Sequence, residues 1–145
     1  MNIKEAVAKT VPEKGYFLVS AFTDEKLEYK TWTLMFYRRS DNTVLDFKVG
    51  IGAEKGDVQP TEKEFQELNV DDMKISAEEA VNSAKGLLSG TKPTAIYISA
   101  NTKDGKTTWT ISFILPDISA AIYDLDAKTG EIIKQDRFSL LRKIK

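Results

Sequence analysis

The stretch that decides the fold is TWTLMFY at residues 31–37, because its pattern returns as TWTISFI at residues 108–114. Trp, an aliphatic residue and Phe alternate with other side chains in both stretches, as Trp32, Leu34 and Phe36 and then as Trp109, Ile111 and Phe113. This period of two is typical of a strand that buries one face. We therefore predict two equivalent strands whose tryptophans pack in the core, with one hydrogen-bond partner for each indole N–H.

The segments around the two stretches also correspond, in the same order along the chain. The matching pairs lie 74 to 79 positions apart: Glu5-Ala6-Val7 with Glu79-Ala80-Val81, Ser20-Ala21-Phe22-Thr23 with Ser99-Ala100-Asn101-Thr102, and Leu45-Asp46-Phe47-Lys48 with Tyr123-Asp124-Leu125-Asp126. Such ordered matches indicate a duplicated unit. The fold class that we predict is α+β, with two tandem repeats that each pack a helix on an antiparallel three- to four-stranded sheet.

Each repeat is predicted to begin with a helix. In the second repeat, Ser76 and Glu79 form a capping box at the start of the helix, and Ser89-Gly90 ends it ahead of Pro93. Its apolar side chains recur at helical spacing: Ala77, Ala80, Val81, Ala84, Leu87 and Leu88. The first helix is shorter and ends near Pro12 and Gly15, with these side chains turned inward: Ile3, Ala6, Val7 and Val11.

Turn residues separate the strands of the second repeat. Asp104-Gly105 is typical of a two-residue hairpin turn, and two further turns, at Pro116-Asp117 and Lys128-Thr129-Gly130, precede a short strand at residues 131–134. Between the repeats, Thr61 and Glu64 form another capping box, which predicts a short helix within residues 61–68. The predicted organisation is a first repeat at residues 1–57, a connector at 58–73 and a second repeat with a basic tail at 74–145.

The second repeat resembles a PepSY domain. The resemblance rests on the helix start at residues 75–81, on Trp109 in its alternating strand, and on the closing hairpin at residues 123–132. The first repeat keeps Trp32 but has the sequence VGIGAEKG at residues 49–56 in place of the acidic turn, so the whole chain is similar to a degenerate tandem PepSY-like or cystatin-like protein. The resemblance implies a helix wrapped by an antiparallel sheet. It also implies a module of protease propeptides and cell-envelope proteins, for which inhibition or protein binding is proposed, and it brings no catalytic residues.

The composition excludes several classes of function. The chain has neither cysteine nor histidine, which removes disulfides, zinc–thiolate sites, and Ser–His–Asp or Cys–His catalysis. Its 21 basic and 22 acidic residues give a net charge of −1, which provides no general attraction to nucleic acid or to an anionic membrane. We therefore expect a protein that is not an enzyme and has no cofactor.

Two charged segments allow a functional and a structural interpretation. Asp124, Asp126 and Glu131 are oxygen-bearing residues around one turn, but Lys128 at the fifth position and Gly130 at the seventh do not fit a calcium loop, and we favour a polar β-turn. The tail at residues 137–145 is basic with apolar insertions and could bind an anionic surface. We favour a solubilising terminus whose apolar side chains pack against the last strand: Phe138, Leu140 and Leu141.

A candidate binding face lies opposite the two tryptophans on their strands. It consists of Thr33, Met35, Tyr37, Thr110, Ser112 and Ile114. These side chains are half apolar, so the face either packs against the other repeat or binds a peptide.

The sequence therefore leads to two hypotheses of function. The first is a non-enzymatic module that binds a protein or peptide through a sheet face or edge, with protease inhibition as one form of it. The alternative is a carrier of a small apolar molecule in a cavity between helix and sheet. With no signal peptide or membrane span in the sequence, we expect a cytoplasmic protein, or an extracytoplasmic one if the chain is a shortened form of an anchored protein.

Overall fold

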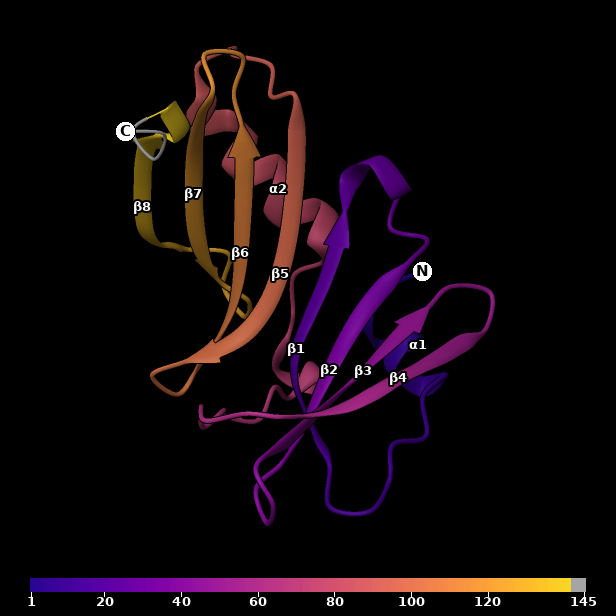
Figure 1. The fold of residues 1–145 in the computed structure, drawn as a ribbon. Coiled ribbons are helices and arrows are strands. Elements are labelled where there is room, and N and C mark those ends of the chain that lie inside the picture. Colours follow the sequence, from indigo (N-terminus) through magenta and orange to yellow (C-terminus); the bar gives the residue numbers. More distant parts are fainter. Residues whose placement is uncertain (142–145) are drawn as a thin grey trace.

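A computed structural model describes residues 1–141 and contains one eight-stranded antiparallel sheet with the order β4-β3-β2-β1-β5-β6-β7-β8 (Figure 1). The first half of the chain forms α1 (Ile3–Ala8), β1 (Phe17–Asp24), β2 (Trp32–Arg38), β3 (Thr43–Val49) and β4 (Ala53–Pro60). The second half forms α2 (Ala77–Lys85), β5 (Ala95–Lys103), β6 (Lys106–Ile114), β7 (Ser119–Asp126) and β8 (Ile132–Ser139). Short 3₁₀ turns are η1 (Glu25–Leu27), η2 (Val70–Asp72) and η3 (Gly86–Leu88). The α+β class and the antiparallel pairing agree with the sequence prediction.

The sheet is continuous across the two halves, whereas the sequence predicted two separate sheets. Strands β1 and β5 pair in antiparallel register, with Ser20 opposite Asn101 and Asp24 opposite Tyr97. Each would otherwise be an edge strand with unpaired backbone N–H and C=O groups, and their pairing satisfies both edges at once. We call this pairing the β1–β5 joint.

Both helices lie behind the sheet in the view of Figure 1. They pack on the face that carries the tryptophans, and their buried residues join one core with those of the strands. From α1 the core receives Ile3 and Ala6, and from α2 it receives Ala77, Ala80, Val81 and Ala84. Within residues 1–141, no helix covers the opposite face of the sheet.

The helices differ from the prediction at their C-terminal ends. Helix α1 stops at Ala8, and Val11 is 87% exposed, so the predicted inward stripe is one turn too long. In the second half the chain tightens from α2 into η3, which turns Leu87 outward and keeps Leu88 buried. A 3₁₀ helix has three residues per turn instead of 3.6, so apolar residues at α-helical spacing no longer lie on one face there.

The helix predicted for residues 61–68 is wrong. Thr61 Oγ1 accepts a hydrogen bond from the backbone N–H of Lys63, and the connector then has no helix or strand until η2 begins at Val70. Its backbone groups bond to strands instead: the N–H of Leu68 donates to the carbonyl of Leu18, and the carbonyl of Glu67 accepts from Thr102 Oγ1. The tertiary partners therefore outweigh the local capping signal.

The predicted turns of the second half are confirmed. Asp104 and Gly105 have φ values of 50° and 77°, as a two-residue hairpin requires. Strand β8 runs on to Ser139, beyond the predicted short strand. Phe138 thus belongs to the last strand itself, Leu141 is half exposed, and the rest of the predicted basic tail, residues 142–145, lies outside the described residues.

Candidate functional site

The two tryptophans anchor the two helices in the same way. The indole Nε1–H of Trp32 donates to the carbonyl of Met1 at 3.0 Å, and that of Trp109 donates to the carbonyl of Ile75 at 3.1 Å. Each carbonyl belongs to the residue before a helix N-cap, Asn2 or Ser76. The predicted core role of both tryptophans, with one partner for each indole, is confirmed.

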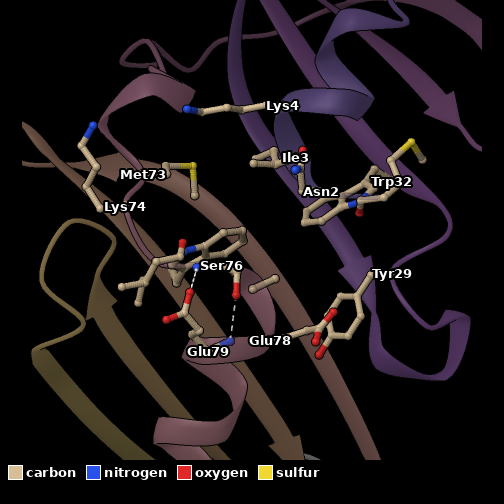
Figure 2. A pocket seen from close by; sticks show the side chains of 14 residues that line it. Asn2, Ile3, Lys4, Tyr29, Trp32, Met73, Lys74, Ser76, Glu78 and Glu79 are labelled. Carbon is tan, nitrogen blue, oxygen red and sulfur yellow. Dashed lines mark hydrogen bonds between the residues drawn. The ribbon is translucent and has the colours of Figure 1, made fainter.

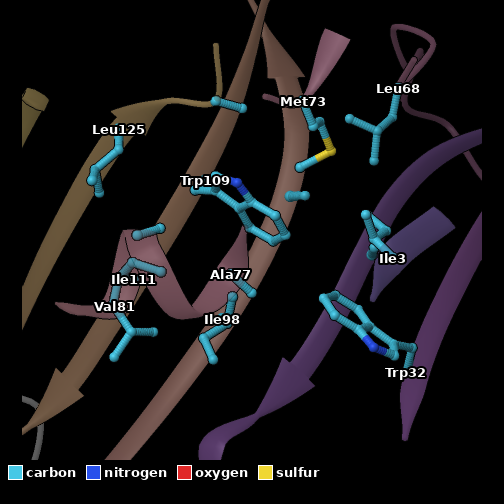
Figure 3. Close-up of a cluster of buried hydrophobic side chains, with 14 of the residues drawn as sticks. Ile3, Trp32, Leu68, Met73, Ala77, Val81, Ile98, Trp109, Ile111 and Leu125 are labelled. Atoms are coloured by element: carbon cyan, nitrogen blue, oxygen red, sulfur yellow. The ribbon is translucent and has the colours of Figure 1, made fainter. Parts of the chain in front are cut away.

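The two anchoring sites meet at the centre of the molecule. The rings of Trp32 and Trp109 are 1% exposed and lie 6.2 Å apart at a tilt of 47° (Figure 3). Both helices carry a capping box, formed by Asn2 with Glu5 and by Ser76 with Glu79. The N-termini of α1 and α2 are thereby fixed beside each other over one aromatic pair.

A pocket of about 330 Å³ lies between these helix starts (Figure 2). We call it the junction pocket, and its lining comes from both halves of the chain: Met1, Asn2, Ile3, Lys4, Tyr29, Trp32, Met73, Lys74, Ile75, Ser76, Ala77, Glu78, Glu79 and Trp109. Because the tryptophans are almost fully buried, they close the floor without offering a free ring face. The pocket is therefore bounded by polar and apolar groups in similar measure.

The rim of the junction pocket carries both signs of charge. Lys4 and Lys74 lie on one side, and Glu78 lies on the other beside Tyr29 (Figure 2). The two lysines are already engaged, since Lys4 Nζ is 3.7 Å from a carboxylate oxygen of Asp71 and Lys74 Nζ donates to the Asp71 carbonyl at 3.1 Å. This rim favours neither an anion nor a cation.

Tyr29 differs from the other residues that line the pocket in its backbone conformation. It has φ 58° and follows Glu28 at φ 53°, two successive left-handed residues that are not glycine. Such a conformation is costly and persists when the surrounding structure holds it. Burial, and to a smaller extent the carboxylates of Glu25 and Glu78, raise the pKa of the Tyr29 hydroxyl to about 12. The hydroxyl is thus a permanent hydrogen-bond donor near neutral pH.

The predicted binding face lies on the side of the sheet without helices. Thr33, Met35, Thr110, Ser112 and Ile114 are partly exposed there, and the register brings the two halves of the set onto one surface. We call the uncharged centre of this surface the open face and define it by these side chains: Ser20, Phe22, Thr33, Met35, Tyr97, Ser99, Thr110, Ser112, Ile114 and Ile122.

Tyr37 is the one residue of the predicted face whose side chain is not exposed there. It is fully buried, because Phe65 of the connector packs on its ring with centroids 5.3 Å apart. Its hydroxyl donates to Asn42 Oδ1 at 2.6 Å. The connector crosses the sheet at this point, which the sequence pattern of one strand does not reveal.

The prediction also missed the two aromatic residues at the centre of the open face. Phe22 and Tyr97 are 42% and 38% exposed, and their rings lie 6.1 Å apart at 21° from parallel. The two rings therefore form an offset-stacked pair, and the exposure of both side chains leaves part of their ring surface free. The sequence does contain a signal for them. Phe22 lies two positions from Ser20 and from Asp24, and Tyr97 lies two positions from Ser99, so each aromatic residue shares a strand face with polar side chains.

A groove of about 720 Å³ continues from this aromatic pair. Tyr97 lines it together with Asp24, Glu25, Lys26, Lys85 and the loop at residues 90–96. Glu25 and Lys85 form an ion pair at 3.3 Å across the groove, between η1 and α2. We call it the loop groove.

The carboxylates of the acidic turn in the second half accept hydrogen bonds from neighbouring parts of the chain. Asp126 Oδ1 accepts from the backbone N–H of Lys128 at 2.8 Å, as the turn interpretation expects. Asp124 accepts from Lys103 Nζ and Thr110 Oγ1 on the sheet surface, at 3.1 and 2.7 Å. In the part of the chain that the structure describes, no three acidic side chains are grouped as a metal site would need.

One antiparallel sheet with helices on a single face defines the molecule as an α+β protein, and its second half has a known counterpart. Residues 74–136 match the family model of the PepSY domain, described as "Peptidase propeptide and YPEB domain". This match confirms the resemblance of the second half and does not include residues 1–73.

The whole fold also has a solved counterpart. A crystal structure of "a putative lipoprotein" from Clostridium difficile 630 is similar with a TM-score of 0.61, covering 86% of this chain and 84% of that chain. The sequence identity is 16%, so the likeness concerns the fold. No curated protein matches this sequence. Among residues 1–141, no helix is long and apolar enough to cross a membrane.

Proposed function

We propose that this protein is a non-enzymatic binding module that holds a protein or peptide partner on the open face. The observation that carries the proposal is the exposed, stacked pair Phe22 and Tyr97 in the middle of a sheet face that no helix covers within residues 1–141. Exposed aromatic residues in the centre of a surface patch are typical of binding hot spots. The PepSY match of residues 74–136 supports a binding role.

The open face belongs to both halves of the chain, which we propose to be diverged copies of one unit. The copies are residues 1–57 and 74–145, with residues 58–73 as the connector. The equivalent tryptophan anchors and capping boxes support this origin. Phe22 comes from the first copy and Tyr97 from the second, so the partner site exists only once, at the β1–β5 joint.

The likeness to a lipoprotein supports an extracytoplasmic setting, in which a binding module of this size would act on envelope or secreted proteins. Protease inhibition is one form that such binding would take, in keeping with the propeptide members that the PepSY description names.

A comparative pull-down tests this proposal. The wild-type protein, the double variant Phe22→Ser/Tyr97→Ser and the control Val58→Ser are immobilised and exposed to native lysate or secreted protein. Val58 is 42% exposed, as Phe22 is, but lies on β4 away from the joint. We expect a partner that wild type and control retain and the double variant loses. Equal retention by all three proteins, or none above background, contradicts the proposal.

The second candidate function, a carrier of a small molecule, is favoured by the junction pocket of about 330 Å³. A volume at the low end of the range for ligand sites suits a compact molecule with both polar and apolar parts. Native mass spectrometry of freshly purified protein tests it directly. Extra mass that disappears in the variant Tyr29→Ala supports the carrier function, whereas a clean unliganded mass contradicts it.

A further inference from the structure

We propose that β8 is a dimerisation edge, which pairs with the β8 of a second copy of this chain, antiparallel and about a twofold axis at Gln135. The pairing joins two eight-stranded sheets into one. This inference concerns an edge of the sheet and does not rest on the proposed function of the open face. It follows from the free backbone groups of β8, from its charge sequence and from a comparison with β4, the strand at the other edge.

The outer side of β8 presents backbone groups that can accept another strand. Strand β8 ends the sheet, and within the described chain it pairs with β7 alone (Figure 1). The N–H of Leu140 donates to the carbonyl of Ile118, one position beyond the last pair of the β7–β8 register. Because hydrogen-bonded positions alternate along antiparallel strands, Gln135 and Arg137 turn their N–H and C=O groups outward. These groups form no hydrogen bond to another described residue.

The approach to this edge is open on both faces of the sheet. Gln135 and Arg137 lie on the face that carries the helices, since they stand opposite Tyr123 and Ala121 of β7. Lys134 and Asp136 lie on the opposite face. All four side chains are exposed, so no described element covers the strand from either side. A second strand therefore has room to align with β8.

The side chains that flank Gln135 are complementary to themselves. Lys134 comes one position before it and Asp136 one position after it. When two copies run antiparallel about Gln135, Lys134 of each copy lies directly opposite Asp136 of the other. Opposite charges directly across a strand pair stabilise the pairing, whereas like charges destabilise it. Neither side chain forms an ion pair with another described residue, so both are available.

The charges also select this register among its neighbours. A twofold axis at Lys134 or at Asp136 would place two like charges opposite each other. An axis at Arg137 would do the same with two guanidinium groups. Of the four residues from Lys134 to Arg137, Gln135 is therefore the one that can lie on the axis without a pair of like charges. A lysine on an edge strand ordinarily opposes pairing with another chain, but here the second copy supplies its counter-charge.

The edge strand of the first half, β4, has the same charge sequence but a different geometry. Its residues 55–57 read KGD where residues 134–136 of β8 read KQD. A bulge interrupts the β3–β4 register at this point, Lys55 is already paired with Glu13, and Pro60 ends the strand without an N–H. In β8 the register shift lies before Lys134, and the ladder is regular from there to Ser139. The comparison favours β8 as the edge that pairs.

Sedimentation equilibrium at low salt tests the inference. A single strand pair buries less than the roughly 1,000 Å² of a stable interface, so the measurements extend to high protein concentration. We expect a reversible dimer for the wild-type protein. Asp136→Lys should weaken it by roughly tenfold or more, because the symmetry creates two pairs of like charges in each dimer. Asp57→Lys makes the same charge change on β4 and, as the matched control, should leave the dimer unchanged.

An exchange of charges identifies the register. Lys134→Asp alone should weaken the dimer as Asp136→Lys does, whereas the double variant Lys134→Asp/Asp136→Lys should restore it, because both pairs form again with their signs reversed. An equimolar mixture of the two single variants should form a heterodimer, since one variant carries two acidic side chains beside Gln135 and the other two basic ones. Circular dichroism checks that each variant is folded.

Three results overturn the inference: a wild-type protein that stays monomeric at every concentration, a dimer that neither single variant weakens, or a mixture of the two folded single variants that stays monomeric. Association that Asp57→Lys abolishes also overturns it, because β4 would then belong to the interface. The pull-down with Phe22 and Tyr97 variants tests the open face separately, since neither residue lies on β8.

Discussion

The two halves of the molecule anchor their helices in the same way, but the helices differ in length and in the number of side chains that they bury. In both, a buried tryptophan holds the carbonyl before a capped helix. Helix α2 then buries four side chains and continues into η3, whereas α1 has six residues and buries two. The second half is thus the better-packed body, and it is the half that matches a family model. Since the anchor is common to both halves, we expect the longer helix to make the second half the more stable one.

The largest effect should come from removing an anchor. Trp109→Ala should lower the free energy of unfolding by about 4 kcal/mol, and Trp32→Ala by about 3 kcal/mol, because each leaves a cavity and an unpaired carbonyl but the second detaches the shorter helix. Urea unfolding followed by circular dichroism measures both. A larger loss for Trp32→Ala would reverse the comparison.

The valines at equivalent helix positions provide a sharper test. Val81 is 1% exposed in α2, and Val7 in α1 is only partly buried. Val81→Ala should lower the free energy of unfolding by about 2 kcal/mol and Val7→Ala by about 0.5 kcal/mol, in proportion to the apolar surface that each valine side chain buries. Equal costs would show that α1 contributes as much to the core as α2.

The capping residues should give a smaller difference in the same sense. Ser76→Ala should cost about 1 kcal/mol, because the cap starts a helix that is packed along its whole length. Asn2→Ala should cost only a few tenths of a kcal/mol, since α1 is short and near a chain end. Thermal unfolding of the two variants, with Asn2→Asp and Ser76→Asp as cap-preserving controls, measures the difference.

The smallest effects on stability are expected from Asp41 and Asp117, which lie in two turns at corresponding places. Each of these acidic residues stands two positions before a residue with a hydroxyl group. A hydrogen bond from Arg38 and one from Thr43 lower the pKa of Asp41 to about 2, while the Ser119 hydroxyl and then Arg137 lower the pKa of Asp117. Because the folded pKa values are depressed, the stabilisation is present above the unfolded value near 4 and is lost as the pH falls toward 2.

Carboxyl ¹³C titrations by NMR measure these turns one at a time. Arg38→Gln should move the midpoint of Asp41 upward and leave that of Asp117 unchanged. Ser119→Ala should do the reverse. A midpoint for Asp41 near 4 in the wild-type protein would contradict the role of Arg38.

Local signals in the sequence predicted the parts of the fold that depend on neighbouring residues. The alternation around Trp32 and Trp109, the capping box at Ser76 and the Asp104-Gly105 turn each specify a structure within a few positions, and the structure contains all of them. The connector shows the limit of such signals, because a capping pattern at Thr61 was overridden by hydrogen bonds to strands far away in the sequence.

The candidate site was predicted only in part for the same reason. Five of the six predicted face residues are partly exposed on the open face, but Tyr37 is covered by Phe65 and the aromatic centre was missed. Phe22 and Tyr97 become neighbours through the β1–β5 joint, and no periodicity within one strand specifies which edges pair. The binding role of the face remains a proposal.

The β1–β5 joint also has a consequence for the time that the chain needs to fold. In residues 1–141 every other strand pairing joins consecutive strands, so hairpins on each side can form quickly from local contacts. The joint must close a loop of 81 positions between Ser20 and Asn101 before Trp32 and Trp109 meet. A long-range closure costs more chain entropy than a hairpin, so we expect the joining of the two halves to be the slow step of folding.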